Sequence, residues 1–236
     1  MSRLCRRAGR RGALNADEPG VDRVAAALEI ESFETPTGWK YFGNLLDAGR
    51  ITLCGEESAG TGSNHVREKD GLWAILLWLN ILAVTGLRAD EIVRDHWRTF
   101  GRDYYARHDY EEVEIQAAQA VMEGLRTKLS RLKGQRLGTL TVLWADEFSY
   151  VDPLDGSRSD QQGIRVVFAE DARAVFRVSG TGTSGATIRV YLERYESNSE
   201  RLNEPTSDML AEVVAAARSV SDIVALTGRS EPSVVT

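Results

Sequence analysis

The side chains best suited to chemistry gather in one glycine-rich stretch, from Cys54 to Gly71. It holds two adjacent carboxylates, two serines, a threonine, a histidine, an arginine, a lysine and four glycines. Glycines let the backbone approach a ligand closely, and each carboxylate can accept hydrogen bonds from several hydroxyls. Such a loop cannot build a core. It therefore indicates a polar ligand site presented beside a core, with a solvated surface loop as the alternative.

A second glycine-rich stretch carries groups suited to an anion. Four successive residues can aim backbone N–H groups and hydroxyls at an anion, as a nest does: Ser179, Gly180, Thr181 and Gly182. Arg177 and Arg189 flank them, and their planar guanidinium groups can grip phosphate oxygens. The Gly-Lys-Ser/Thr ending of a P-loop is absent, so nucleotide binding is not implied. Taken alone, the plainer interpretation is a glycine hairpin with incidental arginines.

Together, three motifs resemble a known family. Cys54 to Gly71 resembles the sugar-binding loop of eukaryotic-type phosphoglucomutases, in the α-D-phosphohexomutase superfamily. Phe33 to Asn44 is similar to the segment before that loop, and Phe176 to Arg189 is similar to the family's phosphate-binding loop. The motifs follow the family's order, and the likeness runs from Val21 to Thr236. This agreement is far more specific than any single glycine-rich loop.

The resemblance implies roles for individual residues. Glu56 and Ser58 would hydrogen-bond the sugar hydroxyls, and Thr37 and Gly38 would contact the sugar ring. Lys69 would lie at the ligand in the closed site. Phosphate binding would fall to the second loop, at Arg177, Ser179, Gly180, Thr181 and Arg189. For the remaining charged residues of the first loop, Glu57, Arg67 and Glu68, a loop-stabilising ion pair is the plainer interpretation.

The resemblance also implies a reaction, the interconversion of glucose 1-phosphate and glucose 6-phosphate. It would proceed through a phosphoserine and glucose 1,6-bisphosphate, with Mg²⁺ held by aspartates. The serine motif of the family, of the type Thr-Ala-Ser-His-Asn-Pro, is absent from this sequence. The metal motif, of the type Asp-Gly-Asp-Gly-Asp-Arg, is absent too. Without these groups phosphoryl transfer loses its main electrostatic terms, so we expect no catalysis by this chain alone.

Other functions therefore remain open. The chain could be a non-catalytic sugar-phosphate binding module, a fragment that complements an N-terminal half of the enzyme, or a remnant with a damaged start. The net charge of −6 and the pI near 5.3 argue against a nucleic-acid binder. The longest apolar run, Leu72 to Val84, is too short to span a bilayer. The two cysteines show no metal-ligand or disulfide spacing, which favours a cytoplasmic location.

Three regions are expected along the chain. Residues 1–20 are rich in arginine and poor in acids, which can mimic an organellar transit peptide. The plainer interpretation is a disordered tail or a mis-assigned translation start. Residues 21–104 would form a partial sugar-binding α/β domain, truncated at its first strand and helix, with an exposed sheet edge. Residues 105–236 would form a C-terminal phosphate-binding α+β domain, which the resemblance implies is complete and TBP-like.

Hydrophobic periodicity, capping residues and turn residues predict the individual helices and strands. Helices are expected over 21–28, 39–46, 71–85, 90–100, 110–132 and 206–226, with Asp70 and Asp109 as N-caps. Strands are expected over 30–33, 51–54, 139–150, 163–168, 173–178 and 187–194, with a hairpin turn at Glu170-Asp171. The apolar helix 71–85 is expected in the core, together with Trp73, Trp78 and Trp97.

Two features have competing interpretations. Asp152 and Asp155 suggest a cation site, but Pro153 and Gly156 make an ordinary turn the plainer interpretation. His65 is a candidate ligand contact, although a lone loop histidine is more often structural.

Overall fold

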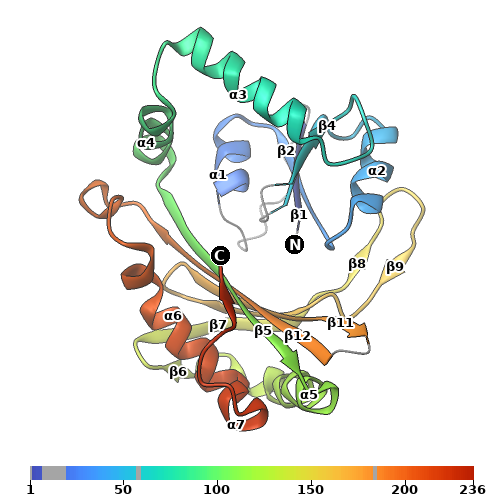
Figure 1. Ribbon diagram of the computed structural model, residues 1–236, viewed down its shortest axis with the longest axis vertical. Helices are drawn as coiled ribbons and strands as arrows, with labels where there is room; N and C mark the ends of the chain where they lie inside the picture. Colours follow the sequence, from blue (N-terminus) through green and yellow to red (C-terminus); the bar gives the residue numbers. More distant parts are fainter. Residues whose placement is uncertain (1, 7–19, 57–59, 183–184) are drawn as a thin grey trace. The chain divides into compact units, whose positions relative to one another are not determined.

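The computed structural model describes residues 2–6, 20–56, 60–182 and 185–236. The chain divides into two units, each with its own sheet (Figure 1). Unit 1 comprises residues 1–101 together with 150–159, and unit 2 comprises residues 102–149 and 160–236.

Unit 1 is built on a four-stranded sheet in the order β2-β1-β3-β4. The strands are β1 (Ser2–Arg6), β2 (Glu31–Thr35), β3 (Leu53–Gly55) and β4 (Thr61–Ser63), each antiparallel to its neighbours. Helix α1 (Gly20–Ala27) precedes β2, and α2 (Trp39–Asp47) connects β2 to the strand that enters the first glycine-rich loop. The two helices and the two strands expected before that loop are confirmed, with shifts of a few residues at their ends.

Strand β1 corrects the expectation of a disordered start. It lies inside the sheet and pairs with β2 on one side and with β3 on the other, so that Leu4 stands opposite both Phe33 and Cys54. Two separated strands carry unpaired backbone N–H and C=O groups, which a strand between them satisfies. Strand β1 therefore pairs one side of β2 and one side of β3, and β2 and β4 are the edge strands of this sheet. The rest of the expected tail, residues 7–19, lies outside the described residues.

The core of unit 1 is small and centres on α2. Phe42, Leu45 and Leu46 turn inward from this helix and pack with Ile51 and the thiol of Cys54. The Trp39 and Phe42 rings meet edge-on, with centroids 5.1 Å apart. The cluster fixes α2 against β3, so the residues just before α2 and just after β3 are held on one small scaffold.

Helix α3 (Gly71–Thr85) has the expected ends. The Asp70 carboxylate accepts a hydrogen bond from the Trp73 N–H at 2.9 Å, and Gly86 closes the helix with a left-handed φ of 67°. Its expected burial is wrong. None of its residues is buried, and Trp78 is 42% exposed. The apolar sequence does predict a helix that needs a cover, but within unit 1 it packs mainly on the short strand β4.

Helix α4 (Ala89–Phe100) follows α3 and ends at Gly101, as expected. Trp97 is half-buried rather than in a core. Among the described residues, no single helix is long and apolar enough to cross a membrane. Only α3 and α4 together meet that condition of length and composition, and they are bent by 83° at their junction.

Unit 2 contains a seven-stranded antiparallel sheet in the order β13-β5-β12-β11-β10-β7-β6. The strands are β5 (Arg102–Val113), β6 (Arg136–Leu137), β7 (Leu140–Glu147), β10 (Ile164–Phe168), β11 (Ala172–Gly182), β12 (Gly185–Glu196) and β13 (Val234–Val235). Helices α5 (Ile115–Leu132), α6 (Thr206–Ser221) and α7 (Ile223–Thr227) cover one face of this sheet (Figure 1). A short 3₁₀ helix, η1 (Ser199–Arg201), leads into α6.

The alternation of side chains gives the two faces of this sheet different chemistry. On the helix-covered face, Ile164, Phe176, Ile188 and Leu192 join the main core. Because successive residues of a strand point to opposite faces, Arg177 and its neighbours in register lie on the other face. The hairpin turn expected at Glu170-Asp171 is confirmed, with Asp171 at a φ of 52°.

Two expected helix limits in unit 2 are wrong. Asp109 does not cap α5, because residues 110–113 continue strand β5 and the helix begins only at Ile115. Asp109 lies instead within the strand, 4% exposed. The last helix is interrupted at Asp222, whose φ of 53° separates α6 from α7.

The two aspartates considered as a cation site lie in the loop of a hairpin, β8 (Tyr150–Val151) and β9 (Arg158–Ser159). Asp152 is buried, and its carboxylate accepts hydrogen bonds from Asn44 Nδ2 and from the Leu154 N–H, each at 2.9 Å. The turn interpretation is therefore confirmed. The same hairpin joins unit 1 through the hydroxyls of Tyr41 and Ser159, 2.8 Å apart.

Candidate functional site

The first glycine-rich loop connects β3 to β4 and presents Glu56. The Glu56 N–H donates to the Gly60 carbonyl at 2.9 Å, which closes the loop at its base. The Glu56 side chain is 4% exposed and forms an ion pair with Lys69, whose side chain is 49% exposed. The structure thus brings together two of the sugar-site residues expected from the sequence. Ser58, together with Glu57, lies outside the described residues.

Two glycines allow this close arrangement. A Cβ on Gly60 would lie 2.9 Å from Lys69 Cδ, so the lysine chain runs directly over this backbone. A Cβ on Gly62 would lie 2.8 Å from the Trp39 ring and 2.9 Å from the Glu68 carbonyl, which is closer than real Cβ contacts. Trp39 therefore packs on the backbone of β4 and joins the start of α2 to the loop.

Thr37 and Gly38 lie immediately before α2. Thr37 is exposed, and Gly38 has a φ of 136°, which favours glycine. Trp39, which follows them, reaches Gly62 of β4 with its ring. The structure places both expected sugar-contact segments on the scaffold of α2, β3 and β4.

His65 is the centre of a hydrogen-bonded chain. Its Nδ1 lies 2.5 Å from the Ser63 hydroxyl, and its Nε2 lies 2.8 Å from the Asp70 carboxylate. Its ring also stacks on Trp73, with centroids 5.6 Å apart. The hydrogen bonds from His65 and from the Trp73 N–H lower the pKa of Asp70.

This series of hydrogen bonds through His65 stabilises the loop and does not activate a nucleophile. In hydrolytic triads the serine bonds to Nε2 and the aspartate to Nδ1, the reverse of the order seen here. Because both ring nitrogens of His65 already have partners, the structure favours the structural interpretation of this histidine over a ligand contact.

Removal of Lys69 is expected to destabilise unit 1. Lys69→Met leaves the Glu56 carboxylate buried without its counter-charge, which we expect to lower the free energy of unfolding by about 2 kcal/mol. Hydrogen exchange at unit 1 amides measures this loss. The double variant Glu56→Gln/Lys69→Met should recover part of it. Arg67→Met is the matched control, because Arg67 and Asp47 form an exposed pair that contributes less than about 1 kcal/mol. Equal losses in the two single variants would contradict the prediction.

Cys54 lies directly beneath this loop and is chemically inert. Burial raises the pKa of its thiol to about 11, and the thiol donates to the Gly62 carbonyl at 3.4 Å. The thiolate is the reactive form, so a pKa raised from 9.0 lowers its fraction near neutral pH roughly 100-fold.

Cys54 is accordingly expected to resist alkylation in the folded chain. In a Cys5→Ser background, iodoacetamide at pH 8 should modify it at least about 100-fold more slowly than in the same chain unfolded in urea. The rate should rise about tenfold per pH unit, because the fraction of thiolate does. A time course by mass spectrometry checks both points. Rapid modification of the folded chain would contradict them.

The second glycine-rich loop is the turn of the long β11–β12 hairpin. Arg177 on β11 and Arg189 on β12 are direct cross-strand partners, and Asp109 on β5 is the next partner of Arg189. The Asp109 carboxylate accepts from Arg107 Nε at 2.9 Å, whereas Arg189 Nε lies 3.8 Å away. Two like charges face each other across the ladder, which is unfavourable unless an anion lies between them.

Other arginines on the same face show what full pairing looks like. Arg165 forms two hydrogen bonds with the Asp146 carboxylate, at 2.8 and 2.6 Å, and Arg173 pairs with Glu193. In contrast, Arg189 Nε is buried and has no hydrogen-bond partner among the described residues. Arg177 donates to the Tyr191 hydroxyl at 3.4 Å, a long contact. The Nε of Arg189 is therefore available to an added anion.

The backbone around this pair is also specialised. Gly180 has a φ of 76°, which favours glycine. Gly163, with a φ of 143°, lies under Arg177, and a Cβ there would be 2.9 Å from Arg177 Cγ. Ser179 lies opposite Thr187 in the hairpin. The backbone of Thr181 continues β11, while its side chain and residues 183–184 lie outside the described residues.

No metal centre accompanies either loop in the part of the chain that is described. There, no group of three or more His, Cys, Asp or Glu side chains is arranged to hold a metal ion. The described residues therefore do not provide the donor set for Mg²⁺ that the family resemblance implies.

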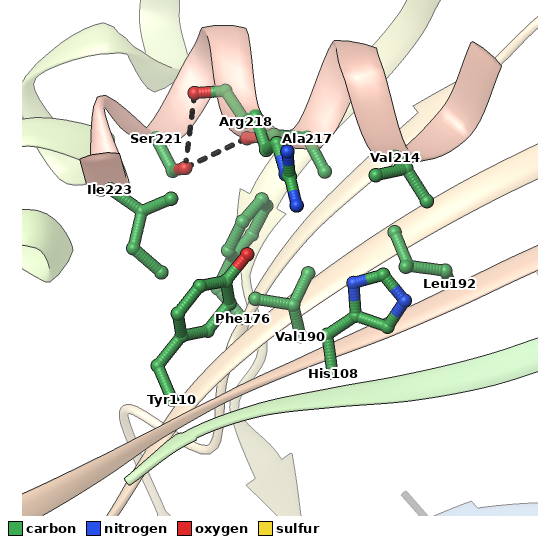
Figure 2. Close-up of a pocket in the computed structure, with 10 residues that line it drawn as sticks. All are labelled: His108, Tyr110, Phe176, Val190, Leu192, Val214, Ala217, Arg218, Ser221 and Ile223. Atoms are coloured by element: carbon green, nitrogen blue, oxygen red, sulfur yellow. Dashed lines mark hydrogen bonds between the residues drawn. The ribbon is translucent and has the colours of Figure 1, made fainter. Parts of the chain in front are cut away.

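A pocket in unit 2 lies on the opposite, helix-covered face of the sheet. Figure 2 shows His108 and Tyr110 from β5 beneath Arg218 and Ser221 of α6, with Phe176 and Val190 between them. Burial, together with the nearby Arg218 guanidinium, lowers the pKa of His108. The lining is mostly apolar, and Arg218 already binds the Glu231 carboxylate at 2.7 Å. The pocket belongs to the core and is not part of the anion site.

Some relevant residues did not stand out in the sequence. Asp109, whose carboxylate lies near both Arg107 and Arg189, is far from the loop in sequence, and so is Arg107. Gly163 carries no motif. The cross-strand pairing of Arg177 with Arg189 could be predicted from the sequence. In a hairpin, two residues at equal sequence distances from the turn lie opposite each other.

Comparison with known families accounts for nearly the whole chain. Residues 102–233 match the family model "Phosphoglucomutase-1, C-terminal domain". Residues 18–100 match "Phosphoglucomutase/phosphomannomutase, alpha/beta/alpha domain III".

Individual relatives agree. The chain is 54% identical to phosphoglucomutase of Rhizobium radiobacter over 216 residues and 48% identical to phosphoglucomutase-1 of Oryctolagus cuniculus over 222 residues. Each match covers 92% of this chain and 40% of the relative, so the chain spans less than half the length of these curated relatives.

A solved structure shows the same likeness. The open form of pp63/parafusin, a phosphoglucomutase from Paramecium, matches with a TM-score of 0.83 at 49% identity. The match covers 92% of this chain and 38% of that chain. Because the C-terminal-domain model alone matches more than half of the residues, the chain belongs to the phosphoglucomutase family, as part of a third α/β domain followed by an α+β C-terminal domain.

Proposed function

We propose that this chain is the sugar- and phosphate-recognising part of a phosphoglucomutase, a protein that interconverts glucose 1-phosphate and glucose 6-phosphate. The ligand class is a hexose phosphate. Unit 1 carries the groups for sugar hydroxyls, at Glu56, Lys69 and the segment Thr37–Gly38, with Ser58 assigned by the family resemblance. Unit 2 carries the groups for a phosphate, at the β11–β12 hairpin. The chain functions in the cytoplasm, where cysteines stay reduced.

One observation carries the proposal most directly: Arg177 and Arg189 stand opposite each other in the ladder while Arg189 shares Asp109 with Arg107. A bound phosphate offers several acceptor oxygens and negative charge, so it relieves the repulsion and gives the buried Arg189 Nε a partner. Backbone N–H groups around Gly180 and the Ser179 hydroxyl supply further donors to the same anion.

The sugar half-site uses a different principle. The Glu56 carboxylate is buried and can accept from two neighbouring hydroxyls, while Lys69 neutralises it. A site that holds a buried carboxylate discriminates strongly against ligands without matching hydroxyls, because the unpaired carboxylate would be left desolvated.

The chain alone does not carry out phosphoryl transfer. Its sequence lacks the serine motif and the aspartate motif of the family, and the described residues offer no metal donor set. Catalysis requires an N-terminal part of a phosphoglucomutase, which supplies the nucleophile and the Mg²⁺ ligands. Glucose 1,6-bisphosphate is the intermediate of that complete enzyme.

A titration with glucose 1-phosphate tests the binding proposal. In ¹H–¹⁵N spectra of the whole chain, we expect saturable shifts at amides of the β11–β12 hairpin and of the β3–β4 loop, with a Kd in the millimolar range. Inorganic phosphate should shift only the hairpin, and glucose alone should shift neither at equal concentration. If glucose 1-phosphate causes no saturable shift at the hairpin, the proposal is wrong.

The alternative is a sugar-phosphate binding module with no catalytic partner. The same titration supports recognition in both cases. The two differ in whether an N-terminal part of a phosphoglucomutase restores turnover when it is added to the chain, an outcome that only the enzymatic assignment predicts.

A further inference from the structure

Strand β13 lies outside β5 at one end of the unit 2 sheet, so β5 would be an edge strand without it. The contact extends beyond the two residues of β13. The Ser233 N–H donates to the Asp109 carbonyl at 2.7 Å, and Thr236 exchanges two backbone hydrogen bonds with Arg107, at 3.0 and 2.8 Å. Figure 1 shows this red segment running beside β5. An edge strand frays more readily than an inner one, so these bonds hold the backbone of Arg107 and Asp109 in place.

The side chains of Arg107 and Asp109 lie on the face of the sheet that carries Arg189. His108, between them in sequence, points toward α6 (Figure 2), and successive residues of a strand point to opposite faces. The Asp109 side chain is 6% exposed, and its carboxylate lies 2.9 Å from Arg107 Nε and 3.8 Å from Arg189 Nε. The longer distance excludes a hydrogen bond, but a buried carboxylate still attracts a guanidinium at that distance.

We propose that Asp109 is a positioning residue for Arg189 and that β13 fixes Asp109 for this role. The inference rests on the proposed function, because the ligand concerned is the phosphate proposed to bind at the β11–β12 hairpin. The Asp109 carboxylate attracts the Arg189 guanidinium toward β5 and opposes its repulsion from Arg177. At 3.8 Å it does so without taking the Arg189 Nε donor. The pairing of β13 with β5 is then coupled to phosphate binding, and each favours the other by the same factor.

The sign of one effect separates positioning from simple charge. A carboxylate beside an anion site repels the anion, so its removal alone should tighten phosphate binding. If Asp109 positions Arg189, its removal instead leaves two arginines that repel each other without a neighbouring carboxylate. Arg189 then loses its preferred position, and ordering it again costs part of the free energy of phosphate binding. Weaker binding therefore indicates positioning, and tighter binding indicates charge alone.

A ³¹P titration of the whole chain with inorganic phosphate measures that sign. Asp109→Asn should bind phosphate about tenfold more weakly than the wild type, a factor within the usual range of coupling between sites. Asp146→Asn is the matched control. Asp146 pairs with Arg165 on the same face, so this variant loses the same charge, and its affinity should stay within about twofold of the wild type. Equal or tighter binding by Asp109→Asn would overturn the proposal.

Substitutions at Ser233 test the contribution of β13. Ser233→Pro removes the N–H that donates to Asp109 and should weaken phosphate binding at least about fivefold. Ser233→Ala keeps that N–H, so its affinity should be close to that of the wild type. The reciprocal effect needs no variant: saturating phosphate should slow hydrogen exchange of the Thr236 N–H at least about fivefold in the wild type. Unchanged exchange there would rule out the coupling, whether or not the proline variant folds.

A measurement without phosphate separates this inference from the proposed function. The Arg189 Nε–H signal in ¹H–¹⁵N spectra is identified by its loss in Arg189→Ala. Its exchange with water should be at least about threefold faster in Asp109→Asn and in Ser233→Pro than in the wild type. If the rates differ in this way but the wild type does not bind phosphate, the positioning of Arg189 stands and the phosphate assignment fails. If the wild type binds phosphate and the rates are equal, the positioning fails and the proposed function stands.

Discussion

Arg189→Ala is expected to weaken phosphate binding by roughly 10- to 100-fold, the effect of losing a charge-assisted hydrogen bond of about 1.5–3 kcal/mol. Arg189 Nε is buried and has no hydrogen-bond partner in the described part of the chain, so its donor is available to an anion. The substitution removes that donor and half of the opposed arginine pair. A ³¹P titration with inorganic phosphate measures the change without involving the sugar.

The fold should tolerate this substitution. Arg189 stands opposite Arg177, so its removal relieves a like-charge contact in the absence of ligand. Asp109 keeps its hydrogen bond from Arg107. We therefore expect the thermal midpoint of unit 2 without phosphate to stay within a few degrees of the wild type or to rise.

Arg194→Ala provides the control. Arg194 lies on the same strand, but it pairs with Glu212 of α6 and so belongs to the helix-covered face. It changes the net charge by the same amount, and phosphate affinity should remain within about twofold. If Arg189→Ala and Arg194→Ala lowered affinity equally, the effect would be one of overall charge and the assignment of the hairpin would fail.

Local sequence signals were sufficient to predict the limits of an element when those limits are set by residues at its own ends. Asp70 and Gly86 set the limits of α3, because a cap acts through groups only a few residues away. The first helix of unit 2 shows the opposite case. An aspartate before a periodic stretch resembles a cap, yet residues 110–113 belong to β5 because strands far away in sequence pair with them. Tertiary pairing overrides the local signal there.

Burial was less predictable than secondary structure. The composition of α3 indicates that it needs an apolar cover, and a helix with that composition normally lies in a core. Whether a cover exists depends on other segments, and the short strands of unit 1 do not provide one. The same limit applies to β1, since an arginine-rich start gives no sign that two separated strands are available to pair with it.

The sequence supplied candidate residues for the site but not their pairings. The family resemblance singled out Glu56 and Lys69 as candidate sugar contacts. Their mutual ion pair and the burial of Glu56 follow only from the way the loop folds over Gly60. Likewise, His65 was a candidate ligand contact, and only the geometry shows that Ser63 and Asp70 occupy its ring nitrogens.

The whole chain is expected to form no detectable glucose 6-phosphate from glucose 1-phosphate, even with glucose 1,6-bisphosphate and Mg²⁺ present. Reactions of phosphate monoesters in water are among the slowest known, and enzymes accelerate them by up to about 10²¹-fold. Nearly all of that acceleration comes from a positioned nucleophile and from charge stabilisation at the transferring phosphoryl group. The substrate recognition proposed for Glu56 and Arg189 cannot replace either term, because uniform binding stabilises the ground state and the transition state alike.

A coupled assay that follows glucose 6-phosphate gives the measurement, with the phosphoglucomutase of Rhizobium radiobacter as positive control. Glu56→Ala is the matched variant, since it keeps the whole preparation the same except for one proposed sugar contact. Turnover in the wild type that the variant lacks would mean that a side chain of this sequence carries the phosphoryl group. Ser63 would be a poor candidate, because it is buried and bonded to His65 in an order unsuited to its activation. Equal, background-level rates would place the nucleophile and the metal outside this sequence, where an N-terminal part of the family must supply them.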